Sequence, residues 1–199
     1  MIQKIINLIF DNTIIFNKFR NIVHNDFKKE KNIIMQEFDV KSNKKILDFG
    51  CGVGQYSVIF KPENYTGVDL DFNNINFAKK NFKGNFFLNK PNKLDFPNDK
   101  FDFIMALAMF HHINNLDLEI ILKEFKRILK PKGKIFIIDL LPHKYQKNIL
   151  SNILISLDRG RFIRDINDLI QIFSKFFKIN KKYFIKTGPY IEYVVVLSK

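Results

Sequence analysis

Residues 46–57 read ILDFGCGVGQYS, and this stretch decides the fold class. A short apolar strand at 44–50, KKILDFG, runs into glycines at positions 50, 52 and 54, and residues 54–60 are expected to begin a helix. Glycine lets the backbone turn sharply and approach a ligand closely. The start of a helix adds free N–H groups and a positive dipole end. The stretch therefore predicts a strand, a tight binding loop and a helix.

An acidic residue ends the next predicted strand. Residues 65–71 read YTGVDLD, and Asp69 stands where a carboxylate can accept hydrogen bonds from ribose hydroxyls. The G-x-G-x-x-G pattern of dinucleotide sites is not met, because Gln55 or Ser57 occupies the position of its last glycine. A G-x-x-x-x-G-K-[ST] phosphate loop is also absent. The loop therefore favours a nucleoside over a pyrophosphate.

Strands and helices alternate from residue 44 onward, which predicts βαβ units and a parallel sheet. The near-continuous apolar run at 101–110 is typical of a strand buried in such a sheet. Two strands that follow the last helix are expected to pair around Gly188-Pro189. The predicted strands are 44–50, 65–71, 85–89, 101–110, 134–140, 181–187 and 192–199, and the predicted helices are 72–82, 116–130, 143–160 and 166–177. Pro131 and Gly133 are expected to end the second of these helices, and Asp165 to cap the last.

The composition excludes several classes of protein. The chain has 199 residues, 46% of them hydrophobic, which excludes a disordered or collagen-like chain. Its one cysteine, Cys51, excludes an internal disulfide and a cysteine-rich zinc site. No apolar run approaches the roughly 18 residues that span a bilayer. Residues 1–20 lack the features of a signal peptide. We expect a soluble, cytoplasmic protein without a transmembrane segment.

The net charge of +13 has two interpretations. It can indicate a polyanionic partner, either nucleic acid or an anionic membrane. It can also reflect a composition rich in Ile, Lys, Asn and Phe, and we favour this explanation because lysines are spread along the whole chain.

The ends of the chain are expected to cover the central domain. Residues 1–43 have apolar positions at helical spacing, including Ile2, Ile5 and Ile9. Such helices can lie on a membrane surface, but we favour a helical cap on the core. The division is then an N-terminal cap at 1–43 and a main domain at 44–199, with a helical or loop cover at about 141–164.

Four stretches resemble, in the correct order, class I S-adenosylmethionine-dependent methyltransferases of the small-molecule type. They are ILDFGCGVG at 46–54, YTGVDLD at 65–71, the segment LDFPNDKFDFIMALAMFHHI at 94–113 and LKEFKRILKPKGKIFIIDL at 122–140. The resemblance covers about half of the chain. It implies a Rossmann-like α/β fold, with a mostly parallel seven-stranded sheet and helices on both faces.

The resemblance also implies S-adenosyl-L-methionine as cofactor. In the family, the glycine loop holds the methionine part, and the acid after the second strand takes the ribose hydroxyls. The next residue lies against the adenine, and the end of the fourth strand offers a carbonyl to the ammonium group. Asn89-Lys90-Pro91 replaces the family's acidic segment near the adenine, and Asn89 is its candidate substitute. The implied cofactor residues are Asp48, Gly50, Cys51, Gly52, Gly54, Asp69, Leu70, Asn89 and Ala106.

His111 and His112 follow the fourth strand, where the substrate is expected to lie. A hydroxyl or ammonium nucleophile needs a proton acceptor, and histidine has a suitable pKa, so both are candidate catalytic residues. Alternatively, one of them caps the next helix or bonds to backbone, because adjacent residues rarely both point into one pocket. Two adjacent histidines without a third ligand are no recognisable metal spacing, so we predict no metal.

A cluster of arginines surrounds Gly160 in the segment DRGRFIR. Arg159, Arg161 and Arg164 form either a clamp for a substrate phosphate or carboxylate, or a solvated basic loop, which we favour. Arg20, His24 and Tyr145 are candidates for a substrate lid.

We expect in-line methyl transfer to a small-molecule or lipid-like metabolite. Neither the N/D-P-P-Y/F tetrapeptide of nucleic-acid amino methyltransferases nor the Pro-Cys pair of cytosine methyltransferases occurs, so nucleic acid is not the expected substrate. Two alternatives stay open. One is an RNA methyltransferase, which the positive charge favours, and the other is a relative that binds the cofactor without catalysis. The sequence makes no prediction of the oligomeric state.

Overall fold

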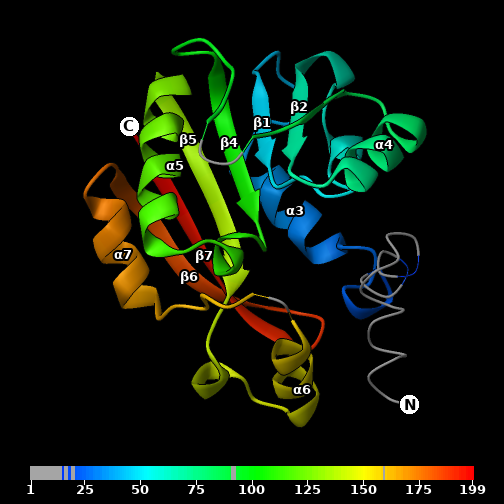
Figure 1. Ribbon diagram of the computed structural model, residues 1–199, viewed down its shortest axis with the longest axis vertical. Coiled ribbons are helices and arrows are strands. Elements are labelled where there is room, and N and C mark those ends of the chain that lie inside the picture. Colours follow the sequence, from blue (N-terminus) through cyan, green and yellow to red (C-terminus); the bar gives the residue numbers. More distant parts are fainter. Residues whose placement is uncertain (1–14, 16–17, 19–20, 91–92, 159) are drawn as a thin grey trace.

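A seven-stranded sheet with the strand order β3-β2-β1-β4-β5-β7-β6 forms the centre of the protein (Figure 1). The computed structural model describes residues 15, 18, 21–90, 93–158 and 160–199. Strands β1 to β5 are parallel, whereas β7 runs antiparallel to both of its neighbours. The strands are β1 (Ile46–Phe49), β2 (Tyr65–Asp69), β3 (Asn85–Leu88), β4 (Phe101–Leu107), β5 (Leu129–Leu140), β6 (Lys178–Thr187) and β7 (Tyr190–Ser198).

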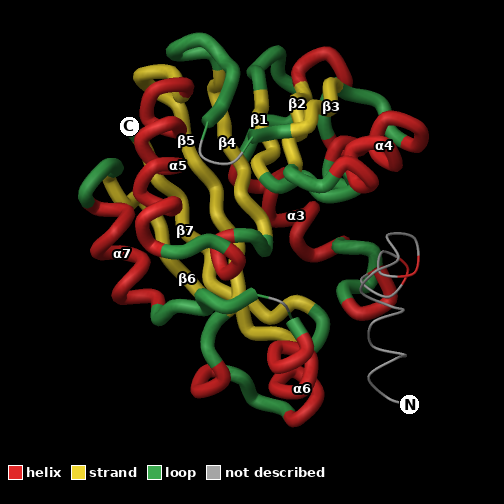
Figure 2. Tube along the Cα trace, in the orientation of Figure 1, coloured by secondary structure: helices red, strands yellow, loops and turns green. Residues whose placement is uncertain are grey.

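Helices cover both faces of the sheet (Figure 2). They are α3 (Lys28–Glu37), α4 (Phe72–Asn81), α5 (Asn115–Ile128), α6 (Ile149–Leu157) and α7 (Ile166–Ser174). One hydrophobic cluster packs α5 and α7 against the sheet, and a second packs α3 and α4. The predicted α/β class, mostly parallel sheet and two helical layers are therefore confirmed. No helix in the described part of the chain is long and apolar enough to cross a membrane.

The glycine loop is not followed by the predicted helix at 54–60. Single 3₁₀ turns stand there instead, at Ser57–Ile59 and Pro62–Asn64. Pro62 disfavours the helical conformation at Lys61, which is extended with φ −67° and ψ 128°. A helix beginning after the loop therefore has room for little more than one turn, and the expected helix dipole at this loop is absent.

Three other predicted helices are shorter than expected, and the one predicted at 166–177 ends at Ser174. The helix predicted at 116–130 ends at Ile128, because Leu129 is extended, fully buried and paired with Phe101 of β4. Pro131 and Gly133 consequently lie within the irregular start of β5. In the segment 143–160, the helix is confined to α6.

The predicted closing strands and the cap of the last helix are confirmed. Strands β6 and β7 pair around a turn at Gly188, which has φ +53°. The Asp165 side chain accepts a hydrogen bond of 3.1 Å from the Asn167 N–H and caps α7.

The N-terminal segment meets the sheet through α3 and the residue after it. Ile34 and Phe38 are buried, and the Phe38 ring lies 4.3 Å from that of Phe103 on β4. The apolar positions Ile2, Ile5 and Ile9 lie outside the described residues. The division between a cap at 1–43 and a domain at 44–199 stays a prediction.

The α5 face of the core depends on Phe125. This side chain is fully buried, and its ring meets Phe49 of β1 edge-on at 5.0 Å. We expect Phe125→Ala to lower the free energy of unfolding by about 3–5 kcal/mol, because it removes a large buried ring. Leu116→Ala, at a position of α5 that is 79% exposed, serves as the control. Urea unfolding measures both, and similar losses in the two variants would contradict this description of the core.

Candidate functional site

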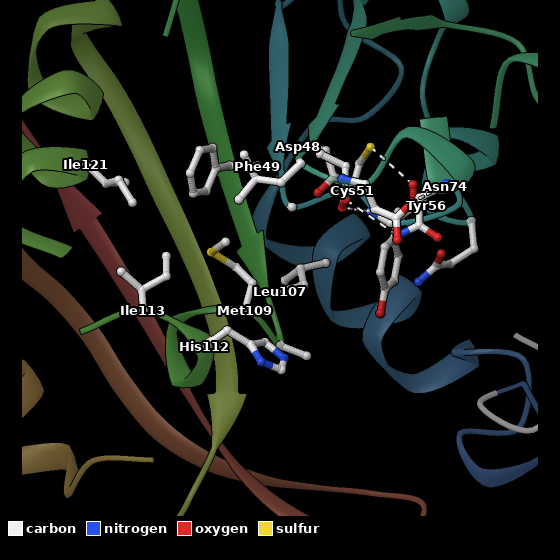
Figure 3. A pocket seen from close by; sticks show the side chains of 17 residues that line it. Asp48, Phe49, Cys51, Tyr56, Asn74, Leu107, Met109, His112, Ile113 and Ile121 are labelled. Atoms are coloured by element: carbon white, nitrogen blue, oxygen red, sulfur yellow. Dashed lines mark hydrogen bonds between the residues drawn. The ribbon is translucent and has the colours of Figure 1, made fainter. Parts of the chain in front are cut away.

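A cavity of about 490 Å³ opens at the carboxyl ends of β1, β2 and β4 (Figure 3). On one side it is lined by residues 48–52, from the end of β1 and the start of the glycine loop, and by residues 55–56 beyond them. The end of β2 and the start of α4 contribute residues 69–71 and Asn74. The other side is formed by residues 107–109, 112–113 and 121, from the end of β4 and from α5. The parallel strands thus bring residues that are distant in sequence to one edge of the sheet.

The glycine loop holds a conformation that side chains with a Cβ rarely adopt. Gly50, Gly52 and Gly54 have φ values of +75°, +53° and +84°. At Gly54, a Cβ would lie only 2.7 Å from the Phe86 ring. The loop is also tied to β2, because the Gly50 N–H donates a hydrogen bond of 2.8 Å to the Val68 carbonyl. These glycines are therefore required by the backbone path.

Asp69 joins the loop to the end of β2. Its Oδ2 accepts a hydrogen bond of 2.8 Å from the Gly52 N–H. Its Oδ1 accepts one of 2.9 Å from the Asp71 N–H and one of 3.4 Å from the Asn74 side chain. The carboxylate lines the cavity and keeps lone pairs for a ligand. The sequence predicted Asp69 but not Asn74, whose only local signal is its place in the first turn of a helix capped by Asp71.

Asp48 is a buried carboxyl group at the floor of the cavity. The Tyr65 hydroxyl donates a hydrogen bond of 2.5 Å to its Oδ2. Burial raises the pKa of Asp48, the Tyr65 hydrogen bond lowers it, and the negative charge of Asp69 raises it further, to about 7 in total. The group is therefore poised to ionise near neutral pH, and a positive charge in the cavity would favour its ionised form.

The other implied cofactor residues divide into two groups. Gly50, Cys51, Gly52 and Leu70 line the cavity together with Asp48 and Asp69. Gly54, Asn89 and Ala106 are not part of its lining, and the Asn89 N–H donates to the backbone carbonyl of Asp69. Their expected contacts with a cofactor stay predictions, as do those of the first group.

Ala108, rather than Ala106, reaches the cavity at the end of β4. Ala108 has φ +50°, an uncommon value for a residue with a Cβ. Its N–H donates a hydrogen bond of 2.8 Å to the Ile138 carbonyl, which holds this conformation. The position of this turn was not evident from the apolar run that contains it.

The two histidines have different surroundings. His112 lines the cavity (Figure 3). His111 is 3% exposed, and its Nδ1 donates to the Asp139 carboxylate, while its Nε2 lies 3.4 Å from Asp158 Oδ1. Burial acts to lower the pKa of His111, but Asp139 and Asp158 outweigh it and raise the pKa to about 10. His111 is therefore an imidazolium held between two carboxylates at neutral pH.

His111, His112 and Asp158 also form a group of potential metal ligands, with all ligand atoms within 4.8 Å of one another. Asp158 is the third group that the sequence did not reveal. Both ring nitrogens of His111 already face carboxylates, however. The expectation of no metal stays a prediction.

Arg164 supports the loop that carries the histidines. Its guanidinium donates to the Phe110 and Ile113 carbonyls and to the Asn115 side chain. In the same segment, the Phe162 N–H donates a hydrogen bond of 2.9 Å to the His111 carbonyl. Arg164 is thus neither a substrate clamp in the cavity nor part of a solvated loop. Arg159 lies outside the described residues.

The lid candidates also have structural contacts. The His24 ring donates a hydrogen bond of 2.7 Å to Glu30, and the Tyr145 hydroxyl donates one of 2.9 Å to Asp165. Arg20 lies outside the described residues. Neither His24 nor Tyr145 lines the cavity.

Comparison with known proteins identifies the family. The family model of a methyltransferase domain matches residues 23–177. The chain belongs to this family. The predicted resemblance is therefore confirmed.

Curated relatives and solved structures agree with this membership. The chain is 33% identical over 110 residues to phosphoethanolamine N-methyltransferase 3 of Arabidopsis thaliana, covering 51% of this chain and 22% of that protein. It is 32% identical over 106 residues to a fatty-acid O-methyltransferase of Mycolicibacterium smegmatis, covering 50% and 38%. The chain thus spans less than half of the length of either relative. A SAM-dependent methyltransferase from Methanosarcina mazei has the same fold, with a TM-score of 0.67 at 19% identity over 84% of this chain and 96% of that one.

The raised pKa of Asp48 predicts a pH-dependent stability. A carboxyl group whose pKa is higher in the folded than in the unfolded protein favours folding while protonated, and this contribution is lost as the pH rises toward 7. Between about pH 5 and about pH 8, the free energy of unfolding of the wild type should fall by on the order of 1–3 kcal/mol because of Asp48. We expect Asp48→Asn to abolish this part of the fall. Chemical unfolding at both pH values measures it, with Asp99→Asn as an exposed control. Parallel pH profiles for Asp48→Asn and the wild type would contradict the assignment.

Proposed function

We propose that this protein is an S-adenosylmethionine-dependent methyltransferase that methylates a small-molecule or lipid-like acceptor. The observation that carries the proposal is a single cavity that joins the Asp69-bound glycine loop to His112. When bound, the cofactor supplies a methyl group that is already activated on a sulfonium. The protein then has to bind and orient the cofactor and the acceptor, and to exclude water. It also has to accept a proton from a protonated nucleophile.

The charges in the cavity suit a cationic cofactor. Its lining contains the carboxyl groups of Asp48, Asp69 and Asp71, and no lysine or arginine among the described residues. This is the reverse of the whole chain, whose net charge is +13. A sulfonium and an ammonium group would be attracted by these carboxylates, and Asp69 would accept hydrogen bonds from ribose hydroxyls.

A buried acceptor atom at the cavity also suits a ligand. Gln55 lines the cavity, and its Oε1 is buried without a hydrogen-bond partner within the described structure. Such an atom costs free energy unless it is satisfied, and a hydroxyl or amino group of a bound nucleoside would satisfy it. We therefore place Gln55 with the expected cofactor residues.

The far side of the cavity is apolar. Phe49, Leu107, Met109, Ile113 and Ile121 point into this region (Figure 3). The surface suits an adenine ring and any apolar part of an acceptor beside it. This apolar surface supports the proposal of a small, partly apolar acceptor. The alternative of an RNA acceptor rests on the overall charge of the chain alone.

We assign the role of general base to His112 and not to His111. A general base must reach the proton that it accepts and must be unprotonated beforehand. His112 lines the cavity, whereas His111 is buried and holds its proton between Asp139 and Asp158. His111 is instead a positioning residue that fixes the loop on which His112 stands.

The cofactor site is tested through Asp69. At about 100 times the dissociation constant, S-adenosylhomocysteine should stabilise the wild type by about 2.7 kcal/mol in a thermal-shift titration, and NAD should not. Asp69→Ala should weaken binding by about 1–3 kcal/mol through lost charged hydrogen bonds. Asp95→Ala, an exposed carboxylate outside the cavity, serves as the control. Equal affinity in the wild type and Asp69→Ala would remove Asp69 from the site.

The catalytic role is tested by separating the two histidines. With an acceptor found in a panel of fatty acids, amines and phenols, His112→Ala should lower turnover by about 10²–10⁴-fold while S-adenosylhomocysteine still binds. His143→Ala changes an exposed histidine and should leave turnover unchanged. Wild-type turnover in His112→Ala would rule out the base, and a loss of cofactor binding in it would assign His112 to the cofactor site.

A further inference from the structure

Helix α6 carries its large apolar side chains on the outside. Ile149, Leu150 and Ile153 are 79%, 57% and 50% exposed, whereas the buried positions include Ser151 and Ile155. No residue of α6 is charged, although 27% of the chain is. A helix that served only to cover the protein would bury these side chains. We refer to Ile149, Leu150 and Ile153 as the α6 apolar face.

Helix α6 lies at the end of the molecule to which the carboxyl ends of the parallel strands point (Figure 1). Asn148 caps α6, and its side chain also donates a hydrogen bond of 3.0 Å to the Pro189 carbonyl in the β6–β7 turn. The neighbouring Gly188 packs closely against the backbone of Val23. Ile22, which precedes Val23, is itself exposed. The β6–β7 turn therefore contacts both the residue that caps α6 and the segment that carries Ile22.

The residues that follow α6 contact the loop that carries His111 and His112. Asp158 follows the helix, and its Oδ1 accepts a hydrogen bond of 2.5 Å from the Gly160 N–H and faces His111 Nε2. The Phe162 N–H bonds to the His111 carbonyl. The helix is thus presented in a fixed position relative to the loop that holds His112, rather than on a free segment.

Basic residues flank α6 in the sequence. Lys147 precedes the helix and Arg161 follows it, and both are exposed. Asp158 is the one acidic residue in the segment 143–164, and it is engaged with His111. A surface of aliphatic side chains beside cations complements an anionic lipid surface, with acyl chains below and phosphates above. Single-stranded nucleic acid is a poorer match, because aliphatic groups offer bases no ring to stack on.

We propose that α6 seats on an anionic lipid surface, with its apolar face among the outer parts of the acyl chains and with Lys147 and Arg161 at the headgroup phosphates. Because α6 lies at the end of the sheet at which the cavity opens, we infer that an acceptor with an acyl or prenyl-like chain reaches the site from the bilayer. This last step rests on the proposed function, whereas the docking itself rests on the surface alone.

Vesicle sedimentation tests the docking. The wild type should bind vesicles containing about one third phosphatidylglycerol in phosphatidylcholine, should not bind pure phosphatidylcholine, and should be released by salt. Replacing the apolar face in Ile149→Ser/Leu150→Ser/Ile153→Ser should lower the bound fraction by about tenfold or more. Val58→Ser/Phe72→Ser/Phe87→Ser removes apolar groups of comparable exposure from other elements and should bind like the wild type.

A second pair of variants tests the charges. Lys147→Glu/Arg161→Glu should lose binding to the anionic vesicles. Lys132→Glu/Lys134→Glu places the same change at the amino end of the parallel part of β5 and should keep it. All variants are checked for an unchanged melting temperature and an unchanged shift with S-adenosylhomocysteine, and Ile149→Ser alone replaces the triple variant if that one is destabilised.

The outcomes separate the inference from the proposed function. Equal vesicle binding by the wild type and the α6 variants, or no binding to anionic vesicles, would overturn the docking. A concentration-dependent dimer that the α6 variants dissociate, seen by light scattering, would assign the face to a second copy and would also overturn it. Absence of a shift with S-adenosylhomocysteine would contradict the proposed function and leave the vesicle result to stand.

Discussion

The site depends on the buried imidazole of His111, which forms ion pairs with two carboxylates. Asp139 comes from the end of β5, Asp158 from the end of α6, and His111 from the loop after β4. The His111 ring therefore connects three elements of the fold. Breaking one side would leave a charge buried without its partner, which costs more free energy than the pair itself contributes. The interaction thus specifies geometry more than it adds stability, and it determines where His112 stands.

Charge is distributed unevenly between the surface and the interior. The chain carries an excess of lysine and arginine, yet the cavity is lined by Asp48, Asp69 and Asp71. A basic exterior does not predict the sign of the field in a cavity, because charges on the open surface are screened by water and salt more strongly than charges that are buried, such as that of Asp48. For this reason the net charge of +13 says more about surfaces such as the one around α6 than about the bound ligand.

The sequence predicted the elements that depend on local pattern. The strands, the glycine loop and Asp69 follow from residues that are close together in the chain, and the structure has each of them near its expected place. The strand predicted at 101–110 ends at Leu107, however, and the one predicted at 134–140 begins at Leu129. The prediction of a helix after the loop was wrong, because Pro62 limits the length of any helix there. Pro62 is a local signal, but the prediction gave more weight to the pattern of apolar residues. The pairing of His111 with Asp139 and the contacts of Arg164 join residues 28 and about 50 positions apart, and no spacing rule indicates such pairs.

The same long-range contacts connect α6 to the loop that lines the cavity. Arg164 and Asp158 both belong to the segment after α6, and both hold the loop with His111 and His112. The segment after α6 is therefore connected to the cavity loop at two points, through Arg164 and through Asp158. If α6 seats on a lipid surface, the position of His112 becomes fixed relative to that surface. An acceptor whose chain stays in the bilayer would then meet His112 at a defined depth, which is the positioning that an in-line transfer requires.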